Sequence, residues 1–180
     1  MNRISAIFAL AGAGALLASC SGKQEQNQVT VPVPVERAGQ VGLDDRKVDV
    51  PKGEDAVKTA LESLFKYAKG RTNAIPEGTK LLDLKVEDRI ARINVSKEFN
   101  KLEGAGNEGE SLAQSAIRRT LAQFKDIDKM VVLVEGKPFE SQHADWSDPI
   151  PVRDKDDVAR GDGRPAINIS PGGRPGGGGE

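Results

Sequence analysis

The chain alternates apolar and polar positions along residues 29–146, and the period of that alternation predicts the type of each element. A period of two predicts strands over residues 29–35, 43–50, 79–86 and 90–95. Apolar stripes at helical spacing predict helices over residues 54–69 and 110–124. The continuous apolar run over residues 130–135 predicts a central strand that is buried on both faces.

The predicted order is β-β-α-β-β-α-β, and each helix has a single apolar stripe. Because one-sided helices cover one face of a sheet, we expect an α/β (α+β) fold. It is a two-layer sandwich in which a mixed five-stranded sheet packs against two amphipathic helices. Pro32 and Pro34 lack a main-chain donor and point the same way, so the first strand is expected at an edge of the sheet. Glu54 and Asp55 are expected in the first turn of the first helix, with Gly70 just after its end.

Glycine recurs between the hairpin and the second helix. Gly104, Gly106 and Gly109 match the letters of a dinucleotide-binding fingerprint, and a predicted helix follows them. The segment before them is not a buried strand, which that fingerprint requires. We therefore expect a flexible loop over residues 104–109 and no nucleotide cofactor.

An apolar run at the N-terminus ends in the pattern of a lipoprotein signal. Arg3 precedes an apolar segment over residues 4–18, which is shorter than the roughly 20 residues that span a bilayer. It closes on Leu17-Ala18-Ser19-Cys20, a lipobox that contains the only cysteine of the sequence. We interpret residues 1–19 as a signal peptide that is cut before Cys20, which then receives the lipid. The alternative is an ordinary signal peptide with a coincidental cysteine.

Lipidation would fix where the protein works. Several acyl chains on Cys20 anchor a protein stably, whereas one chain does not. We expect an exported protein on the outer membrane of a cell that has one, as Ser21 favours, and otherwise on the outer face of the cell membrane. The mature chain then has no thiol for a disulfide, a thiolate metal site or cysteine catalysis.

Composition divides the rest of the chain into three parts. Residues 20–28 are polar and predict a lipidated tether, residues 29–146 predict the folded domain, and the Gly/Pro-rich residues 147–180 predict a disordered tail. Ending the chain after residue 150 is then expected to leave the melting temperature nearly unchanged. The net charge is −1, with 26 basic and 27 acidic residues, so nucleic acid is not expected as a partner.

The candidates for chemistry are few. His143 is the only histidine and lies just past the last predicted strand, where a surface position is more common than a catalytic one. Glu108 and Glu110, or the acids on either side of Trp146 (Asp145 and Asp148), would suit a glycosidase acid pair, although acids at such places are more often capping or solvent-facing. The acids of the tail lack the spacing of a calcium loop; they are Asp154, Asp156, Asp157 and Asp162. We expect no catalytic residue, no cofactor and no metal site.

Two further features bear on partners. Arg118 and Arg119 are expected on the outer, solvated face of the second helix. Trp146 and residues 149–151 form an apolar cluster just after the domain. This cluster could fold back onto the sheet or dock another protein, and both alternatives stay open.

Segments along the domain resemble the GerMN domain, which is named for sporulation and spore-germination proteins and also occurs in lipoproteins of bacteria that do not sporulate. The segments are AIPEGTKL (74–81), VED (86–88), ARINVSKEF (91–99), LAQ (112–114), RTLAQF (119–124) and MVVLVEGKP (130–138). The resemblance covers residues 29–139. It implies a non-catalytic α/β module of the cell envelope that assembles envelope complexes or binds a small or cell-wall ligand.

The chain departs from the family pattern at three places. Arg89 stands where the family has a glycine in the hairpin; because a left-handed residue with a side chain costs roughly 1 kcal/mol or more, a different turn is expected. Arg119 replaces a family tyrosine, and Gly70-Arg71 replaces a family Gly-Pro after the first helix. A ligand pocket that uses those groups would be altered here.

Three functions are compatible with these observations. The first is a non-catalytic, lipid-anchored scaffold that binds another envelope protein through a sheet edge or helix face, in envelope complex assembly or in sporulation- or germination-type processes. The second is a lipoprotein that binds a peptidoglycan fragment or small ligand in a pocket, which a deep pocket with convergent polar groups would favour. The third and least favoured is an envelope hydrolase.

Overall fold

The computed structural model describes residues 28–143, 146 and 148–153. The predicted order β-β-α-β-β-α-β is confirmed, with two short strands and a 3₁₀ helix in addition. The elements are β1 (Gln28–Arg37), β2 (Gln40–Asp49), α1 (Ala56–Ala68), β3 (Leu81–Glu87), β4 (Ile90–Val95), η1 (Lys97–Ala105), α2 (Gly106–Ala122), β5 (Lys129–Val134), β6 (Lys137–Pro138) and β7 (Ile150–Pro151).

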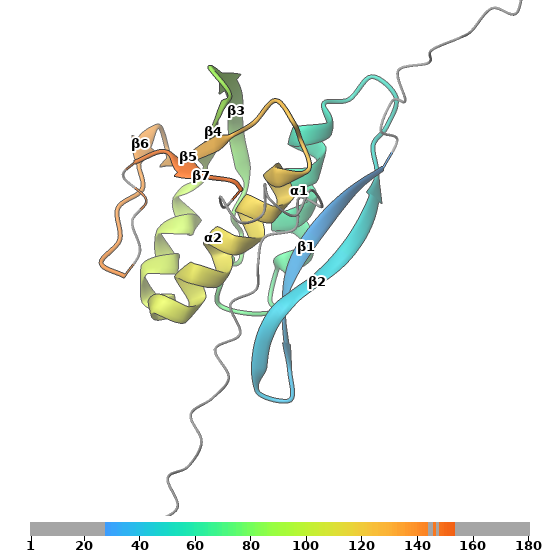
Figure 1. The fold of residues 1–180 in the computed structure, drawn as a ribbon. Helices are drawn as coiled ribbons and strands as arrows, with labels where there is room; N and C mark the ends of the chain where they lie inside the picture. Colours follow the sequence, from blue (N-terminus) through green and yellow to red (C-terminus); the bar gives the residue numbers. More distant parts are fainter. Residues whose placement is uncertain (1–27, 144–145, 147, 154–180) are drawn as a thin grey trace, which may run out of the picture.

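The sheet of five strands is mixed, as predicted, but its members differ from those expected. Its order is β3-β4-β5-β6, and β7 pairs with β5 beside β6; β4 and β5 are parallel and the other pairs are antiparallel. β1 and β2 form a separate two-stranded sheet that lies across α1 and α2 (Figure 1). The periodicity shows which face of a strand is apolar, but it does not show which layer covers that face.

Both helices therefore contact apolar surface on two sides. Val29, Val31 and Val33 of β1 are buried and belong to the same core as the inward side chains of β4 and β5. α2 is buried at successive positions around its axis, including Ala116, Ile117, Thr120, Leu121 and Ala122. Its apolar surface is wider than the single stripe of a two-layer sandwich, so the hairpin adds a third layer.

The prolines of β1 mark an edge strand, as predicted, although both are buried. Pro32 and Pro34 alternate with valines that face the helices, and β1 pairs only with β2 in the described residues. At Thr30 the main-chain groups on the outer edge of β1 bond to the Gln123 side chain instead of to another strand. The amide of Gln123, just past α2, accepts from the Thr30 N–H at 2.9 Å and donates to the Thr30 carbonyl at 2.9 Å.

α1 begins and ends on local signals. The Oδ1 atom of Asp55 accepts from the N–H groups of Val57 (2.8 Å) and Lys58 (3.0 Å), so Asp55 is the N-cap and not a first-turn residue. Gly70 follows the helix with φ of +66°, a left-handed conformation that glycine adopts without strain. Its predicted position just after the helix is confirmed.

The prediction of a flexible glycine loop over residues 104–109 is wrong. η1 runs to Ala105 and α2 starts at Gly106, so this segment is helical. A Cβ on Gly109 would lie 2.5 Å from the Cβ of Ala105, which is too close for any side chain. Gly109 is therefore required by packing, and the dinucleotide-like spacing is not preceded by a strand.

The expected change of turn at Arg89 does not occur. Asp88 (φ +50°) and Arg89 (φ +64°) form a left-handed two-residue turn between β3 and β4. Arg89 is held there by its side chain, which donates to Asp128 at 2.5 and 2.9 Å and to the Lys125 carbonyl at 2.7 Å. These contacts offset the strain that a glycine would avoid.

The folded body extends past the predicted boundary at residue 146. β7 pairs with β5, and Val152 is fully buried. Trp146 is buried in edge-to-face contact with Phe99 and Phe139, at centroid distances of 6.0 and 5.4 Å. The cluster after the domain thus folds back, and we name residues 148–153 the C-terminal strap.

The remaining parts of the predicted organisation lie outside the described residues. These are the signal peptide, Cys20, the tether up to residue 27 and residues 154–180. Gln28, expected in the tether, is the first residue of β1. Within the described ranges, the helices are too short or too polar to cross a bilayer.

Candidate functional site

An open cleft of about 680 Å³ lies where three separate segments meet. The first segment is the end of the β1–β2 hairpin, the second is the loop that follows α1, and the third is the junction of η1 and α2. Apolar side chains in the lining come from Val41, Ala74, Pro76, Ala105 and Leu112. Glycine main chain is contributed by Gly70, Gly104 and Gly109. A volume of this size lies within the range of small-ligand sites.

Charged side chains of both signs line the same cleft. The acids are Glu36, Glu77 and Glu108, and the bases are Arg71 and Lys101. Glu77 is also paired with Lys69 at 3.1 Å, on an exposed part of the surface. Thr72 accepts from the Ala74 N–H at 3.2 Å, which shapes the loop after α1. The cleft can therefore offer both donors and acceptors to a ligand.

Arg71 is one of the family departures noted from the sequence, and it lies in the cleft lining. The other departure on a helix, Arg119, lies elsewhere. Its Nη2 atom contacts Asp45 of β2 at 3.0 Å, and its side chain is only 15% exposed. Arg118 donates from Nε to the Pro151 carbonyl at 2.7 Å. The prediction that both arginines lie on a solvated face is wrong, because α2 is covered by the hairpin on one side and by the strap on another.

The predicted acid pair Glu108 and Glu110 is split. Glu108 is exposed and lines the cleft, whereas Glu110 is completely buried. One Glu110 oxygen accepts from the Ser141 hydroxyl, and the other lies 3.1 Å from Nδ1 of His143. The prediction of a surface position for His143 holds only in part, because its side chain is 40% exposed but bound to a buried carboxylate.

The three side chains of this Glu110 cluster are not arranged for nucleophilic catalysis. The Ser141 hydroxyl donates to Glu110 and accepts from the main-chain N–H of His143 at 3.0 Å. In a catalytic triad the hydroxyl bonds to the imidazole, which in turn bonds to the carboxylate. Here both groups bond to the same carboxylate, so the histidine does not reach the hydroxyl proton. The cluster joins the segment after β6 to the start of α2.

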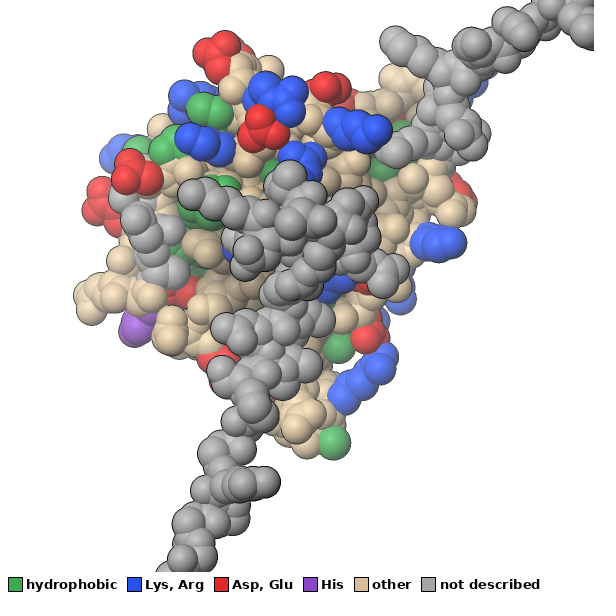
Figure 2. Space-filling view, viewed as in Figure 1, with side chains coloured by type: hydrophobic (Ala, Val, Ile, Leu, Met, Phe, Trp, Pro, Cys, Tyr) green, Lys and Arg blue, Asp and Glu red, His purple; other side chains and the backbone are tan. Residues whose placement is uncertain are grey.

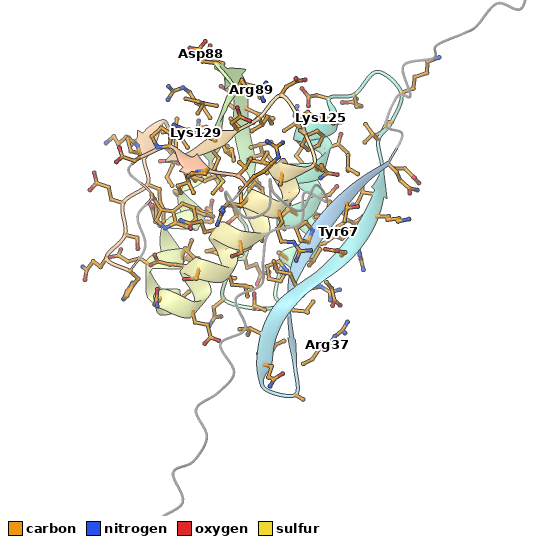
Figure 3. The ribbon with its side chains drawn as sticks, in the orientation of Figure 1. Arg37, Tyr67, Asp88, Arg89, Lys125 and Lys129 are labelled. Carbon is orange, nitrogen blue, oxygen red and sulfur yellow. The ribbon has the colours of Figure 1, made fainter. Side chains whose placement is uncertain are left out.

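A second charged group fixes the end of α2. The Asp128 carboxylate accepts hydrogen bonds from Arg89 of the β3–β4 turn and from Arg153 of the strap, the latter at 3.2 Å. Figure 3 shows Arg89 at the β3–β4 turn, with Lys125 and Lys129 at the same end of the molecule. The hydrogen bond from Arg89 is the main cause that holds the pKa of Asp128 below its usual range.

Arg153 also closes the helix end itself. Its guanidinium donates to the carbonyls of Ala122 (3.1 Å), Phe124 (2.6 Å) and Ile127 (2.9 Å). Carbonyls at a helix C-terminus have no partner within the helix and carry partial negative charge. Arg153 therefore has a structural role, which residue spacing alone did not indicate.

The other sequence candidates supply no further site. Asp148 is exposed at the start of the strap, and its proposed partner Asp145 lies outside the described residues. The described residues hold no group of three or more His, Asp, Glu or Cys side chains that could bind a metal ion. On the visible face, lysine, arginine and acidic side chains are interspersed, without a large patch of one sign (Figure 2).

Comparison with solved structures supports the fold. The first GerMN domain of the sporulation protein GerM from Bacillus subtilis is similar with a TM-score of 0.52 and 21% identity, over 69% of this chain and 96% of that one. The tandem GerMN domains of the same protein give 0.48 and 22%, over 68% and 44% of the two chains. A candidate lipoprotein from Clostridium perfringens gives 0.39 and 23%, over 72% and 88%.

No curated protein sequence matches the chain significantly. A family model does match: the Germane family, described as sporulation and spore germination, aligns with residues 19–140. This is more than half of the chain, and the family is not a known catalytic one. The chain belongs to the Germane (GerMN) family.

Proposed function

We propose that the protein is a lipid-anchored component of the cell envelope that acts by binding and performs no chemistry. In this proposal the cleft receives a segment of another envelope protein, and the contact contributes to assembly of an envelope complex, in sporulation- or germination-type processes. The cleft is the single observation that carries the proposal. The lipobox at Leu17–Cys20 supports the location.

The charges of the cleft favour a peptide as its occupant. Both signs line one open groove, with Arg71 and Lys101 facing a space shared with Glu36 and Glu108. An ionic ligand of one sign would be repelled by part of this lining, whereas a polar peptide segment presents donors and acceptors of both kinds. The glycine main chain in the lining allows close approach of a ligand backbone.

A peptidoglycan fragment is the second candidate. Its short peptides carry amino and carboxylate groups together, which also suits a lining of both signs. The observation that favours it is the volume of about 680 Å³, which is typical of sites for small ligands. The protein partner and the peptidoglycan fragment can be told apart by which of them is crosslinked to the cleft in living cells.

Site-specific photo-crosslinking tests the proposal. A photoreactive amino acid at Val41, which lines the cleft, is expected to trap a partner in intact cells, whereas the same residue at Lys137 on β6 is not. Arg71→Glu together with Lys101→Glu should weaken trapping at Val41 by about tenfold or more, because two attractive contacts become repulsive. The exposed Lys47→Glu with Lys137→Glu serves as the matched charge control.

Each outcome decides one point. A trapped protein supports complex assembly, and a product that is released only by muramidase digestion supports the peptidoglycan candidate. Equal trapping at Val41 and Lys137, or trapping that is unaffected by the double substitution, would show that the cleft is not the binding site.

Replacing Cys20 with serine tests the anchor. The acyl chains provide the membrane affinity, so C20S is expected to abolish incorporation of radiolabelled palmitate and to give an unprocessed precursor. Serine has no thiol that could receive the lipid. Palmitate labelling that persists in C20S, or equal gel mobility of both chains, would refute lipidation at this residue.

A further inference from the structure

β3 is the edge strand of the five-stranded sheet, and its outer side has no strand partner in the described part of the chain. Among the described residues, the large apolar side chains that are exposed are Val41, Leu82 and Val86. Leu82 (52% exposed) and Val86 (43%) both belong to β3. Apolar side chains at an unpaired edge favour pairing with another strand.

The outer edges of β1 and β3 both lack a strand partner among the described residues, but they differ in what would oppose a further strand. The edge of β1 has prolines at residues 32 and 34, and Gln123 occupies the main-chain groups of Thr30. β3 has no proline, and its bulge lies at its start, between Leu81 and Asp83. Residues 83–87 are in regular register with β4. The edge of β1 is therefore blocked, and that of β3 is open.

The sequence of β3, Leu-Leu-Asp-Leu-Lys-Val-Glu, is complementary to itself in the antiparallel direction. With Leu84 on a two-fold axis, Asp83 of each strand lies opposite Lys85 of the other, and Leu82, in the bulge, comes near Val86 of the other strand. Asp83 and Lys85 share one face of the strand, since their charged groups are 4.0 Å apart within the chain.

We propose that β3 pairs with β3 of a second copy of this chain, antiparallel across a two-fold axis at Leu84. The main-chain groups of the outer edge bond across the axis, as in any antiparallel pair. The two Asp83–Lys85 contacts set the register, and the Leu82–Val86 contacts bury the exposed apolar side chains. The result is one continuous sheet through both copies, with an isologous interface.

The expected affinity is modest. Pairing of one short strand buries an area at the low end of specific interfaces, so the dissociation constant is expected between about 10 µM and 1 mM. The interface does not depend on the cleft or on the lipid. It can therefore fail or succeed independently of the proposed function.

Reversal of the two charges gives a decisive test. The chain from Ser21 onward, which retains every described residue, is studied by sedimentation up to about 1 mM. Asp83→Lys and Lys85→Asp each place like charges opposite one another in both contacts, and each is expected to weaken the dimer by about tenfold or more. Both side chains are more than half exposed, so the fold should tolerate either change.

The restoring combinations separate pairing from damage. An equimolar mixture of D83K and K85D should form the heterodimer as strongly as the unmodified chain dimerises, because every contact again joins opposite charges. The double variant D83K/K85D should self-associate normally for the same reason. Three results would overturn the proposal. The unmodified chain could stay monomeric at about 1 mM, or the single variants could associate as strongly as the unmodified chain. The third is that mixing D83K with K85D does not restore association.

Discussion

A chain that ends after Ser147 is expected to be less stable than one that ends after Asp154 by about 3–5 kcal/mol. The shorter chain lacks the strap, including Val152, which is fully buried, and Arg153. Loss of a buried valine costs about 1.5–3 kcal/mol. Loss of Arg153 removes the donor that binds the carbonyls at the end of α2, and it leaves Asp128 with Arg89 alone as its ion-pair partner.

Thermal unfolding measures this difference. For a body of this size we expect the melting temperature to fall by about 10 °C or more. The chain that ends after Asp154 is the matched control, because it keeps every contact of the strap and differs by seven residues from the shorter one. Single substitutions divide the effect: Val152→Ala reports on burial, and Arg153→Ala reports on closure of the helix end. Equal melting temperatures for the two truncations would show that the strap is not part of the cooperative unit.

Local patterns predicted the elements because their causes are local. The valines of β1, the apolar stripe of α1 and the apolar run of β5 each follow a period that one element imposes on its own sequence. The edge position of β1 followed from Pro32 and Pro34 for the same reason. The position of the β1–β2 hairpin could not be predicted from the sequence. The same alternation of apolar and polar residues results whether a sheet or two helices cover the valines.

The sequence left open whether residues 149–151 fold back, because the stability of the strap comes from distant partners. A composition rich in glycine, proline and charge predicts disorder, yet Ile150 pairs with Met130 and Arg153 binds carbonyls more than twenty residues earlier. Arg89 is a similar case. Its left-handed turn was judged from the cost of the conformation alone, while the compensating contact, Asp128, lies 39 residues away.

The two candidate sites differ in how far the sequence could reveal them. Glu110 precedes Ala113 and Ile117 at spacings of three and seven residues, so it continues the buried stripe of α2. A carboxylate on a buried stripe implies a polar partner, and this signal was present. The cleft had no such signal, because its lining comes from three segments that only the tertiary fold brings together.

Replacing His143 with alanine is expected to destabilise the protein by about 2–3 kcal/mol. The substitution leaves the fully buried Glu110 carboxylate without the imidazole that lies 3.1 Å away. Removing one partner of a completely buried polar pair can cost more than this, but the His143 side chain is 40% exposed and solvent screens part of the interaction. Urea unfolding measures the loss, and Gln142→Ala on the same exposed segment is the matched control.

A double-mutant cycle distinguishes loss of the polar contact with Glu110 from simple loss of packing. Glu110→Gln keeps an acceptor for the Ser141 hydroxyl and removes the charge, so H143A/E110Q is expected to recover half or more of the stability lost in H143A. If the loss came only from packing, E110Q would restore nothing in the H143A background. If H143A were as stable as Q142A, the Glu110 cluster would not hold the segment after β6 against α2. The structural role that we assign to the cluster would then be wrong.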